Sequence, residues 1–553
     1  MNKENSQSPK HPVHRLYQFL ELEKRDINLL IVLTFGYGIL GIATPISVQT
    51  LVNIVAMGGV LQPLYVVSLI LFVLLLLSGV LYVFEVYVVE LIQRRLFVRT
   101  SINIAKKAQG VDASIYDHSN PVEFMNRFFD VSIIQKATAT LLTVGLAALL
   151  QGLIGSVILI FYSVYFAIIV LVLLVLLAFI IIVLGRRAIN TAIEESKAKY
   201  ATGDWLETIA RNFYVFKFYY GLDRAKRISN AMAGDYLEAR KKHFSTLLFQ
   251  NIGAVTLYAI VGTLMLALGG GLVIKGQINL GQFVAAELII FGVLAAFVRF
   301  VSKLEYFYDM VAALDKVGLL DDLPQEIIGA QEISKERFNQ LEAMNLTFNY
   351  STRISLFKNL SFTLATAESI AILGKSGAGK TTLISLISGL RKPINGHITF
   401  GGNDLRQLNQ NTLRNAIGIA GRVEVMDGSI IENVILDRAH ITFENVNWVL
   451  AELGLQDDFA KLEDGLDTKL TAFGAPLSTT QLQRLMLARA IVGEPRLLII
   501  DGLLDNLTDT ELNSVMRLLE KHKASWMLIV TTRFASIARQ FNHTLTLNQR
   551  DAN

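Results

Sequence analysis

The sequence predicts two parts of different fold class, an all-α bundle of six membrane helices followed by an α/β domain. Acidic and basic residues are absent from two long apolar stretches, 27–84 and 137–185, and they are rare in a third, about 245–308. From about residue 341 the composition becomes that of a soluble α/β domain, with a buried strand, a glycine-rich loop and a helix in succession. The chain is therefore predicted to be a multi-domain membrane protein.

The composition excludes several classes of protein. Hydrophobic residues make up 52% of the chain, charged residues 18%, and the mean hydropathy is +0.45. A typical soluble domain carries about 25% charged residues, which argues against a wholly soluble protein. The sequence contains no cysteine, so disulfides, thiol redox chemistry and thiolate metal sites are excluded. A net charge of +4 on 553 residues gives no support for nucleic-acid binding.

The apolar stretches set the number and the orientation of the helices. A spanning helix needs about 20 apolar residues, so each stretch holds two helices joined by a short turn. We place these turns at 56–59, around Ser163 and at 275–277. Basic residues concentrate in the long segments after the second and fourth spans, which makes both termini and both long loops cytosolic. We expect a multi-pass protein of the bacterial inner membrane, lying in the lipid bilayer.

These observations divide the chain into four segments. Residues 1–26 form a cytosolic N-terminal segment with an elbow helix, and residues 27–310 form the six-helix transmembrane domain. Residues 311–340 are expected to be a polar linker, and residues 341–553 form the α/β domain.

Three acidic residues interrupt the predicted spans. Glu85 and Glu90 fall at the inner end of the second span, where we expect them to be solvated. Glu287 lies about 10 Å into the last span at 1.5 Å per residue. A charge near mid-bilayer is costly, so Glu287 is a candidate for the translocation path. A protonated or water-reaching glutamate near the interface is the alternative.

The α/β domain contains a phosphate-binding P-loop. The strand Ser369–Leu373 is followed by residues that match G-x-x-x-x-G-K-[ST], and these precede a helical run. The glycines let backbone N–H groups surround phosphates, and the helix N-terminus adds a favourable dipole. Lys380 would reach the β- and γ-phosphates and Thr381 would bind Mg²⁺. The residues of this candidate site are Gly374, Ser376, Gly377, Ala378, Gly379, Lys380, Thr381 and Thr382.

A second apolar strand ends in Asp501, which is where a P-loop fold holds its Mg²⁺ ligand. A helix-capping role for this aspartate is the alternative.

Six membrane helices with long cytosolic loops, joined to a P-loop domain, resemble an ABC exporter half-transporter over nearly the whole chain. The resemblance assigns Tyr350, in Leu346–Tyr350, to stacking on adenine, and it implies ATP and Mg²⁺ as ligands. The segment from Leu477 stands where the family has its LSGGQ signature, with Ser478, Thr479, Thr480 and Gln481 as the signature residues. The membrane half is similar, more weakly, to exporters of the hemolysin-type secretion group.

The sequence departs from the family at the catalytic positions. Gly502 replaces the glutamate after the Walker B aspartate, and Thr532 stands at the switch histidine. Gly421 occupies the Q-loop glutamine position, or Arg422 if the register slips by one. Loss of general-base assistance typically costs about 10²–10⁴ in rate. We therefore expect this chain to bind ATP but to hydrolyse it slowly.

In this family a half-transporter works as a dimer, with each ATP between one chain's Walker A and the other's signature. We favour a heterodimer with a glutamate-bearing partner, and a homodimer stays open. Thr479 and Thr480, in place of glycines, put the contribution of this chain's signature in doubt. The alternative to an exporter is a non-pumping ATP sensor or scaffold for a partner membrane protein. We also consider a periplasmic adaptor as a further partner.

Overall fold

A computed structural model describes residues 12–56, 61–117, 126–326, 329–351 and 354–547. The chain forms two compact units. The first unit takes in the described residues of 1–111 and 118–324, and the second takes in 112–117 and the described residues from 325 onward.

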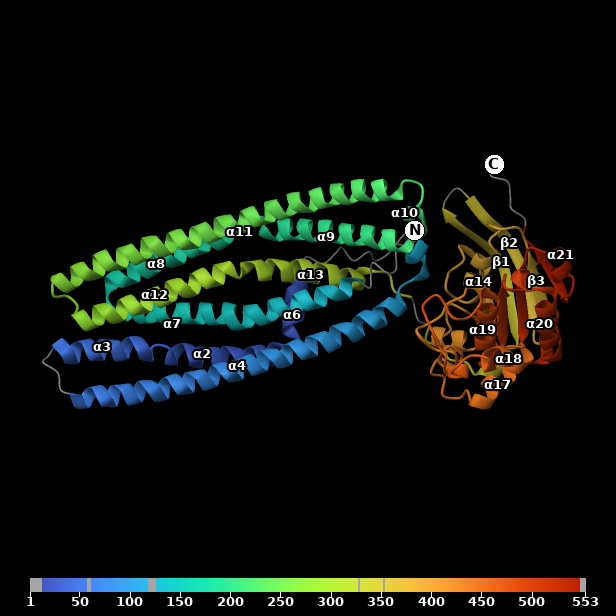
Figure 1. Cartoon of the computed structure of the whole chain (residues 1–553), viewed down its shortest axis with the longest axis horizontal. Coiled ribbons are helices and arrows are strands. Elements are labelled where there is room, and N and C mark those ends of the chain that lie inside the picture. Colours follow the sequence, from blue (N-terminus) through green and yellow to red (C-terminus); the bar gives the residue numbers. More distant parts are fainter. Residues whose placement is uncertain (1–11, 57–60, 118–125, 327–328, 352–353, 548–553) are drawn as a thin grey trace. The chain divides into compact units, whose positions relative to one another are not determined.

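The first unit consists of helices (Figure 1). Six of its described helical segments are long and apolar enough to cross a membrane, as the charge-free stretches predict. Successive segments run antiparallel to one another. The helices of this unit are α1 Pro12–Glu21, α2 Lys24–Leu40, α3 Ala43–Ala56, α4 Leu61–Gly110, α6 Asp130–Thr140, α7 Leu146–Tyr162, α8 Val164–Phe179, α9 Ala188–Arg211, α10 Phe213–Lys217, α11 Gly221–Ile274, α12 Leu280–Ser302 and α13 Leu304–Asp322.

The first span is interrupted between α2 and α3. Proline lacks the N–H that an α-helix needs, so Pro45 is tolerated only in the first turn of a helix. Pro45 lies in the first turn of α3, and the helix is broken just before it, at 41–42. The turn expected around Ser163 is also present: the Ser163 side chain accepts a hydrogen bond from the Tyr165 N–H and caps α8.

Apolar side chains make up most of the interior of the helical unit. α12 packs against α3, α7 and α11, and its small residues Ala285, Ala286 and Ala296 are fully buried. α13 continues as a helix to Asp322, so the first part of the segment expected to be a linker is helical.

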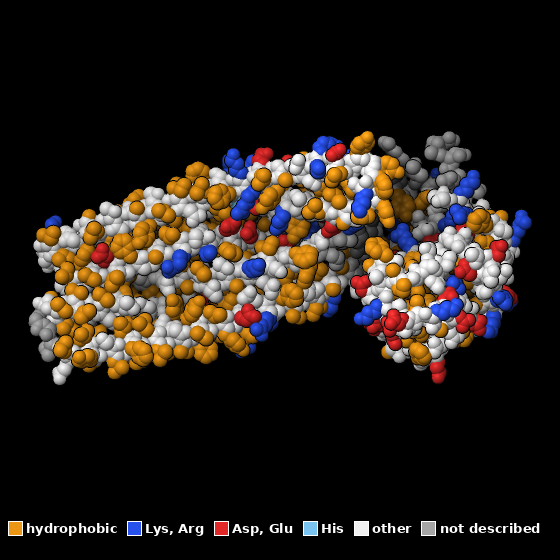
Figure 2. Space-filling model, in the orientation of Figure 1, with side chains coloured by type: hydrophobic (Ala, Val, Ile, Leu, Met, Phe, Trp, Pro, Cys, Tyr) orange, Lys and Arg blue, Asp and Glu red, His pale blue; other side chains and the backbone are white. Residues whose placement is uncertain are grey.

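Hydrophobic side chains also cover much of the outer surface of this unit, as Figure 2 shows, while charged side chains gather over the part that holds α9 and the first half of α11. An outward-facing apolar surface of this extent fits a bilayer rather than water.

The second unit contains two main sheets and the helices around them. The antiparallel sheet has the strand order β2-β1-β4-β5 and the parallel sheet has the order β11-β3-β10-β9-β6; a short pair is formed by β7 and β8. The strands are β1 Gln340–Ser351, β2 Ile354–Ala365, β3 Ser369–Leu373, β4 Asn395–Phe400, β5 Asn403–Asp404, β6 Ile417–Ala420, β7 Gly428–Ser429, β8 Lys469–Leu470, β9 Leu497–Asp501, β10 Met527–Thr532 and β11 His543–Thr546. The helices are α14 Lys380–Ile387, α15 Gln410–Asn415, α16 Ile430–Ile435, α17 Phe443–Glu452, α18 Gln456–Ala460, α19 Thr479–Val492, α20 Asp509–Lys521 and α21 Ala535–Ala538.

The parallel sheet separates two apolar cores. In β9, Leu497 and Ile499 face the core shared with the antiparallel sheet, whereas Leu498 and Ile500 face the core that contains α19. Both faces are covered, so the strand is apolar throughout, as is typical of a parallel sheet. The carboxyl ends of β3, β9 and β10 lie at the same edge of the sheet, and this edge positions the candidate site.

Candidate functional site

The loop between β3 and α14 has the backbone geometry that a phosphate cradle requires. Gly377 and Gly379 have φ values of +82° and +91°, a region that residues with a Cβ rarely adopt. The Gly374 N–H donates to the Thr532 carbonyl at 3.2 Å, which ties the start of the loop to β10. Ala378 is buried, while Ser376 and Gly377 are exposed. The loop is therefore anchored at its start and open at its tip.

Lys380 and Thr381 start α14 and lie at the end of the loop. The Lys380 ammonium donates to the carbonyls of Gly374 at 2.6 Å and Lys375 at 2.9 Å, so the side chain folds back across the loop. The Thr381 hydroxyl donates to Asp501 Oδ2 at 2.9 Å. The structure thus brings together the two residues that the sequence predicts as Mg²⁺ ligands.

Asp501 has a further partner that the sequence reasoning missed. The Thr531 hydroxyl donates to Asp501 Oδ1 at 2.6 Å, because β9 and β10 are parallel neighbours with these two residues in register. Each carboxylate oxygen of Asp501 therefore accepts one threonine hydroxyl. Only the strand pairing could have revealed this contact, and nothing in the sequence around Asp501 indicates it.

This donor set fits Mg²⁺ together with a phosphate chain. Mg²⁺ is commonly held by one or two carboxylates with waters and substrate phosphates rather than by a complete protein cage. Thr381 and Asp501 would supply a hydroxyl and a carboxylate oxygen. The remaining ligands would come from phosphate and water.

Tyr350 lies at the end of β1, beside the start of α14. Its ring is about half exposed, and its hydroxyl lies 2.9 Å from the hydroxyl of the buried Thr382. The guanidinium carbon of Arg391 lies 5.0 Å from the centre of the Tyr350 ring, and Arg391 is also ion-paired with Asp117 at 2.6 Å. An exposed ring fixed at its hydroxyl end can offer a face for stacking.

Gly502 directly follows Asp501 and has a φ of +67°. A Cβ at this position would meet no atom within 4 Å, so the space for a longer side chain exists. The positive φ nevertheless disfavours any residue other than glycine. The local backbone is thus suited to glycine rather than to the glutamate that the family resemblance implies.

Thr532, at the switch position, is fully buried and committed to a turn. Its hydroxyl donates to Asp505 and accepts the Phe534 N–H at 3.0 Å. Asp505 Oδ2 accepts the Arg533 N–H at 3.0 Å. These bonds hold the Thr532 side chain inside the turn, where it cannot extend toward a phosphate.

Gly421, at the Q-loop position, packs closely on the Walker B strand. A Cβ there would lie 3.0 Å from the Asp501 Cβ and 3.3 Å from its carbonyl oxygen. A residue with a Cβ at 421 would press on Asp501, which would have to shift by a few tenths of an ångström. Arg422 is exposed.

The signature residues form a second cluster, at the N-terminus of α19. Ser478 and Gln481 make a reciprocal capping box: the Ser478 N–H donates to Gln481 Oε1 at 2.9 Å, and the Gln481 N–H donates to Ser478 Oγ at 3.4 Å. Thr479 is exposed, and the Thr480 hydroxyl lies 3.4 Å from Ser478 Oγ. The polar side chains of the signature therefore stabilise their own helix end.

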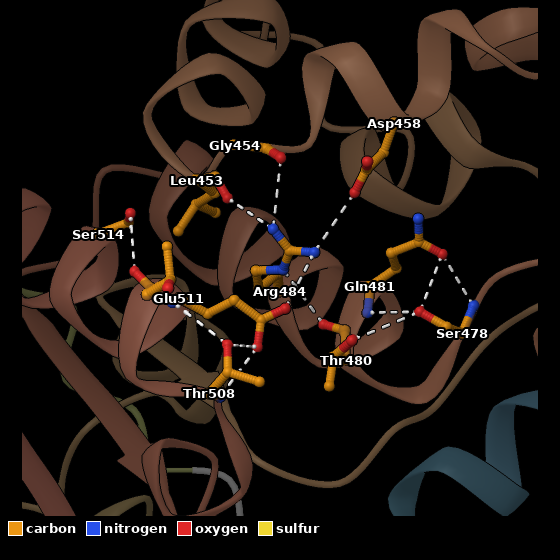
Figure 3. Close-up of polar contacts among 11 residues, drawn as sticks. Leu453, Gly454, Asp458, Ser478, Thr480, Gln481, Arg484, Thr508, Glu511 and Ser514 are labelled. Carbon is orange, nitrogen blue, oxygen red and sulfur yellow. Dashed lines mark hydrogen bonds and ion pairs between the residues drawn. The ribbon is translucent and has the colours of Figure 1, made fainter.

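Arg484, one turn further along α19, fixes this helix to its surroundings (Figure 3). The guanidinium donates to the Leu453 carbonyl at 3.2 Å and the Gly454 carbonyl at 3.3 Å. It is also ion-paired with Asp458 at 3.4 Å and Glu511 at 3.3 Å. Since Arg484 is only 9% exposed, these bonds are shielded from water. The sequence reasoning did not single out Arg484 or Glu511.

Glu511 couples Arg484 to α20. It caps that helix by accepting the Thr508 N–H at 3.0 Å and the Thr508 hydroxyl at 2.8 Å. Burial raises the pKa of Glu511, but the Thr508 hydrogen bonds and the Arg484 charge outweigh burial and hold the pKa below its ordinary value. Glu511 is therefore ionised at neutral pH.

Glu287, the candidate for a translocation path, lies in α12 and is half-buried. Its neighbour Ala286 is fully buried, while Leu288 is exposed. The side chain thus starts from the margin of the packed face of α12.

The chain thus combines a helical unit with six candidate membrane spans and an α/β unit that contains a P-loop and an aspartate at the end of a neighbouring strand. These features are typical of a membrane protein with a nucleotide-binding domain. Residues 27–297 match the family described as ABC transporter transmembrane region, and residues 357–504 match ABC transporter. The chain belongs to the ABC transporter family, in the half-transporter arrangement of one transmembrane domain and one ABC domain. This confirms the predicted fold class.

Among similar proteins, the alpha-hemolysin translocation ATP-binding protein HlyB of Escherichia coli is 28% identical over 300 residues, 53% of this chain and 42% of HlyB. The mitochondrial ATP-dependent permease MDL2 of Saccharomyces cerevisiae is 26% identical over 477 residues, 82% of this chain and 60% of the permease. The chain thus spans about half the length of these curated relatives. A solved bacterial Atm1-family ABC exporter with ATP bound has the same fold, with a TM-score of 0.82 over 95% of this chain and 94% of that one, at 18% identity.

Proposed function

We propose that this chain is one subunit of an ATP-driven exporter, that it binds ATP with Mg²⁺ at its own P-loop, and that it hydrolyses this ATP slowly. The main support for this proposal is the contrast between retained and missing groups at the end of β9. Asp501 retains a Thr381 partner suited to Mg²⁺, while the adjacent Gly502 has no side chain and Thr532 is bonded to Asp505.

Retained nucleotide binding is supported by the loop geometry and the groups around it. The left-handed glycines leave room for backbone N–H groups to converge on phosphates, and Lys380 lies across the same loop. Tyr350 offers a partly exposed ring for the base. Bound ATP supplies the phosphoanhydride chemistry; the residues of this chain hold it, orient it and bind its metal ion.

Slow hydrolysis is supported by the loss of groups that act on the attacking water. The general-base position is Gly502, and the switch position is a neutral threonine whose hydroxyl is already engaged. The Q-loop position is Gly421, packed against Asp501. Loss of general-base assistance alone costs about 10²–10⁴ in rate, or roughly 3–5.5 kcal/mol.

A dimer follows from the half-transporter arrangement, and we favour a heterodimer. A homodimer would hold two sites with Gly502, whereas a partner that carries the glutamate could complete one competent site. This chain would lend Ser478 and Gln481 to that site. The exposed Thr479, where the family has glycine, would limit close approach of the signature to a phosphate.

We place the dimer in the bacterial inner membrane with both termini in the cytosol, and we expect it to move a substrate out of the cytosol. A substrate-contacting role for Glu287 and a periplasmic adaptor are compatible with this assignment.

The second candidate function is an ATP-responsive regulator or scaffold that does not pump. The engaged Thr532 hydroxyl favours it, because a site that holds ATP without cleaving it can act as a sensor. If the chain is a sensor, its effect on the partner membrane protein should persist when the partner's own catalytic glutamate is removed. If the chain is part of a transporter, removal of that glutamate should abolish substrate movement.

The test is to purify the tagged chain from its native membrane, identify its partner and measure ATP binding with wild-type chain and Lys380→Ala. We expect a second half-transporter with a catalytic glutamate, and ATP binding lost in the variant. Exclusive homodimers with brisk ATP turnover would overturn the heterodimer and the impaired site together.

A further inference from the structure

A carboxyl group is buried inside the membrane domain without a charge partner. The sequence predicts that Glu85 is solvated like Glu90, and for Glu85 this prediction is wrong. Glu85 is 1% exposed, and neither of its carboxylate oxygens makes a hydrogen bond. Glu90 is exposed and forms an ion pair with Arg94 at 2.8 Å.

The burial of Glu85 follows from its place on the packed face of α4. Buried positions recur along α4 at three- to four-residue intervals around it, and α2, which packs against both α4 and α7, has a buried stripe of its own. Thr34 lies on that stripe, fully buried, with its hydroxyl also unbonded and near the Glu85 carboxyl. The two buried stripes are Ser78, Glu85, Val88, Val89, Ile92 and Leu96 on α4, and Leu30, Thr34 and Gly38 on α2.

Aromatic and apolar side chains flank the site on both sides along α4. One turn beyond it the rings of Tyr37 and Tyr82 are in contact, with centres 6.0 Å apart. On the other side Leu30, Val88 and Val89 pack together in one cluster. These neighbours shield the Glu85 side chain, which is 1% exposed, from water.

Within the part of the chain that the structure describes, the elements that pack most closely against α4 carry no charged group level with Glu85. The stretch 27–84 and the stretch 137–185, which include α3, α7 and most of α2, contain no acidic or basic residue. α6 and α13 carry charges, but Gln135 of α6 donates to the Gln93 carbonyl at 2.9 Å, eight residues along α4 from Glu85. Eight residues correspond to about 12 Å of helix. The charged residues on the facing elements are Lys24, Arg25 and Asp26 of α2, Asp130 and Lys136 of α6, and Glu305, Asp309, Asp315, Lys316, Asp321 and Asp322 of α13; on α4 itself they are Glu90, Arg94, Arg95, Arg99, Lys106 and Lys107.

The side chains at Glu85 favour a proton over a metal cation as the bound species. An ionised carboxylate without a partner or water is strongly disfavoured in an apolar interior. Hard cations such as Ca²⁺ and Mg²⁺ take about six or more oxygen ligands, whereas the side chains of Glu85 and Thr34 offer two carboxylate oxygens and one hydroxyl. A single proton needs no cavity and neutralises the carboxyl.

We propose that Glu85 and Thr34 form a proton-binding site in the membrane domain. The carboxyl is protonated while α2 and α4 are packed together, and it gives up its proton to water when the two helices separate. The O–H bond breaks heterolytically and leaves a carboxylate that is stable only in the separated state. The packed arrangement therefore binds one more proton than the open one, so a rise in pH favours opening.

The first experiment detects the proton directly, by infrared spectroscopy of the full chain in lipid vesicles at pH 7. We expect a carbonyl stretch of a protonated carboxylic acid that is lost in Glu85→Gln and kept in the matched control Glu90→Gln. Glutamine has nearly the shape of the neutral acid, so Glu85→Gln should also fold like the wild type. A protonated-acid band that is identical in the wild type and Glu85→Gln would overturn the proposal.

The second experiment measures opening of the contact. Because the natural chain has no cysteine, Val89→Cys provides a single thiol at a position that is 3% exposed. A membrane-permeant maleimide would label it only when α2 and α4 separate. We expect the labelling rate, divided by that in the Glu85→Gln background, to rise by up to about tenfold per pH unit. The division cancels the effect of pH on the ionisation of the thiol itself. A ratio that does not change with pH would refute the link between loss of the Glu85 proton and separation of α2 and α4.

Discussion

Substitution of Gly502 tests which missing group limits hydrolysis. Gly502 has a φ of +67° and no atom within 4 Å of a Cβ placed there. Glutamate therefore fits sterically but carries the left-handed backbone strain, about 1–2 kcal/mol. Alanine carries the same strain without a carboxylate, so Gly502→Ala is the matched control.

The expected difference in hydrolysis rate between the two variants depends on the contribution of the general base and on the backbone strain. A positioned general base contributes about 10²–10⁴ in rate, and the strain, shared by both variants, cancels in their ratio. Because Thr532 and Gly421 remain, we expect the lower end, with Gly502→Glu hydrolysing ATP roughly 10²-fold faster than Gly502→Ala.

The assay is steady-state phosphate release by the purified chain, with ATP affinity measured in parallel. It is run in the natural background and in Thr479→Gly/Thr480→Gly, so that an impaired signature does not conceal the gain. ATP affinity should be the same for both Gly502 variants. Equal rates for Gly502→Glu and Gly502→Ala in both backgrounds would refute the reasoning that the absent carboxylate limits turnover.

Three further predictions follow from the α/β unit. Arg484→Met should lower the free energy of unfolding by about 2–4 kcal/mol in chemical denaturation, because it leaves the carbonyls of Leu453 and Gly454 without a donor. The control is Arg517→Met at an exposed position, which should change the free energy of unfolding by less than about 0.5 kcal/mol. The pKa of Glu511 is depressed in the folded state, so the stability that ionised Glu511 contributes is present above the unfolded pKa of about 4.3 and is lost as pH falls through the lower folded pKa. The wild type should therefore lose thermal stability below about pH 4.3 more steeply than Glu511→Gln. Parallel profiles of melting temperature against pH would contradict this. Tyr350→Ala should weaken ATP binding by about 1–3 kcal/mol in a fluorescence titration, whereas Tyr350→Phe, which loses only the contact with Thr382, should bind nearly as the wild type does.

Much of the fold could be predicted because its signals are local in the sequence. A span needs about 20 apolar residues, so charge-free stretches reveal membrane helices directly. The strand, glycine loop and helix around Lys380 are contiguous, and so is the apolar strand that ends in Asp501. The expected turn at 56–59 falls partly on residues 57–60, which lie outside the described residues.

The rest depends on contacts between distant segments. The bond from Thr531 to Asp501 requires the register of β9 and β10, and the bond from Thr532 to Asp505 requires the turn after β10. The burial of Glu85 could not be predicted because a uniformly apolar helix gives no periodic signal of which face is packed. Its position near the end of the charge-free stretch indicated solvent, whereas the facing stripe on α2 covers it.

The most direct test of the account is the identity of the nucleotide that the intact chain retains. The purified chain is incubated with labelled ATP and Mg²⁺, separated rapidly from free nucleotide, and the bound ATP and ADP are measured over time. We predict that the bound nucleotide remains mainly ATP over many minutes and that Lys380→Ala retains none. Bound ADP accumulating at about 1–10 turnovers per second, a common rate for a competent enzyme, would contradict it.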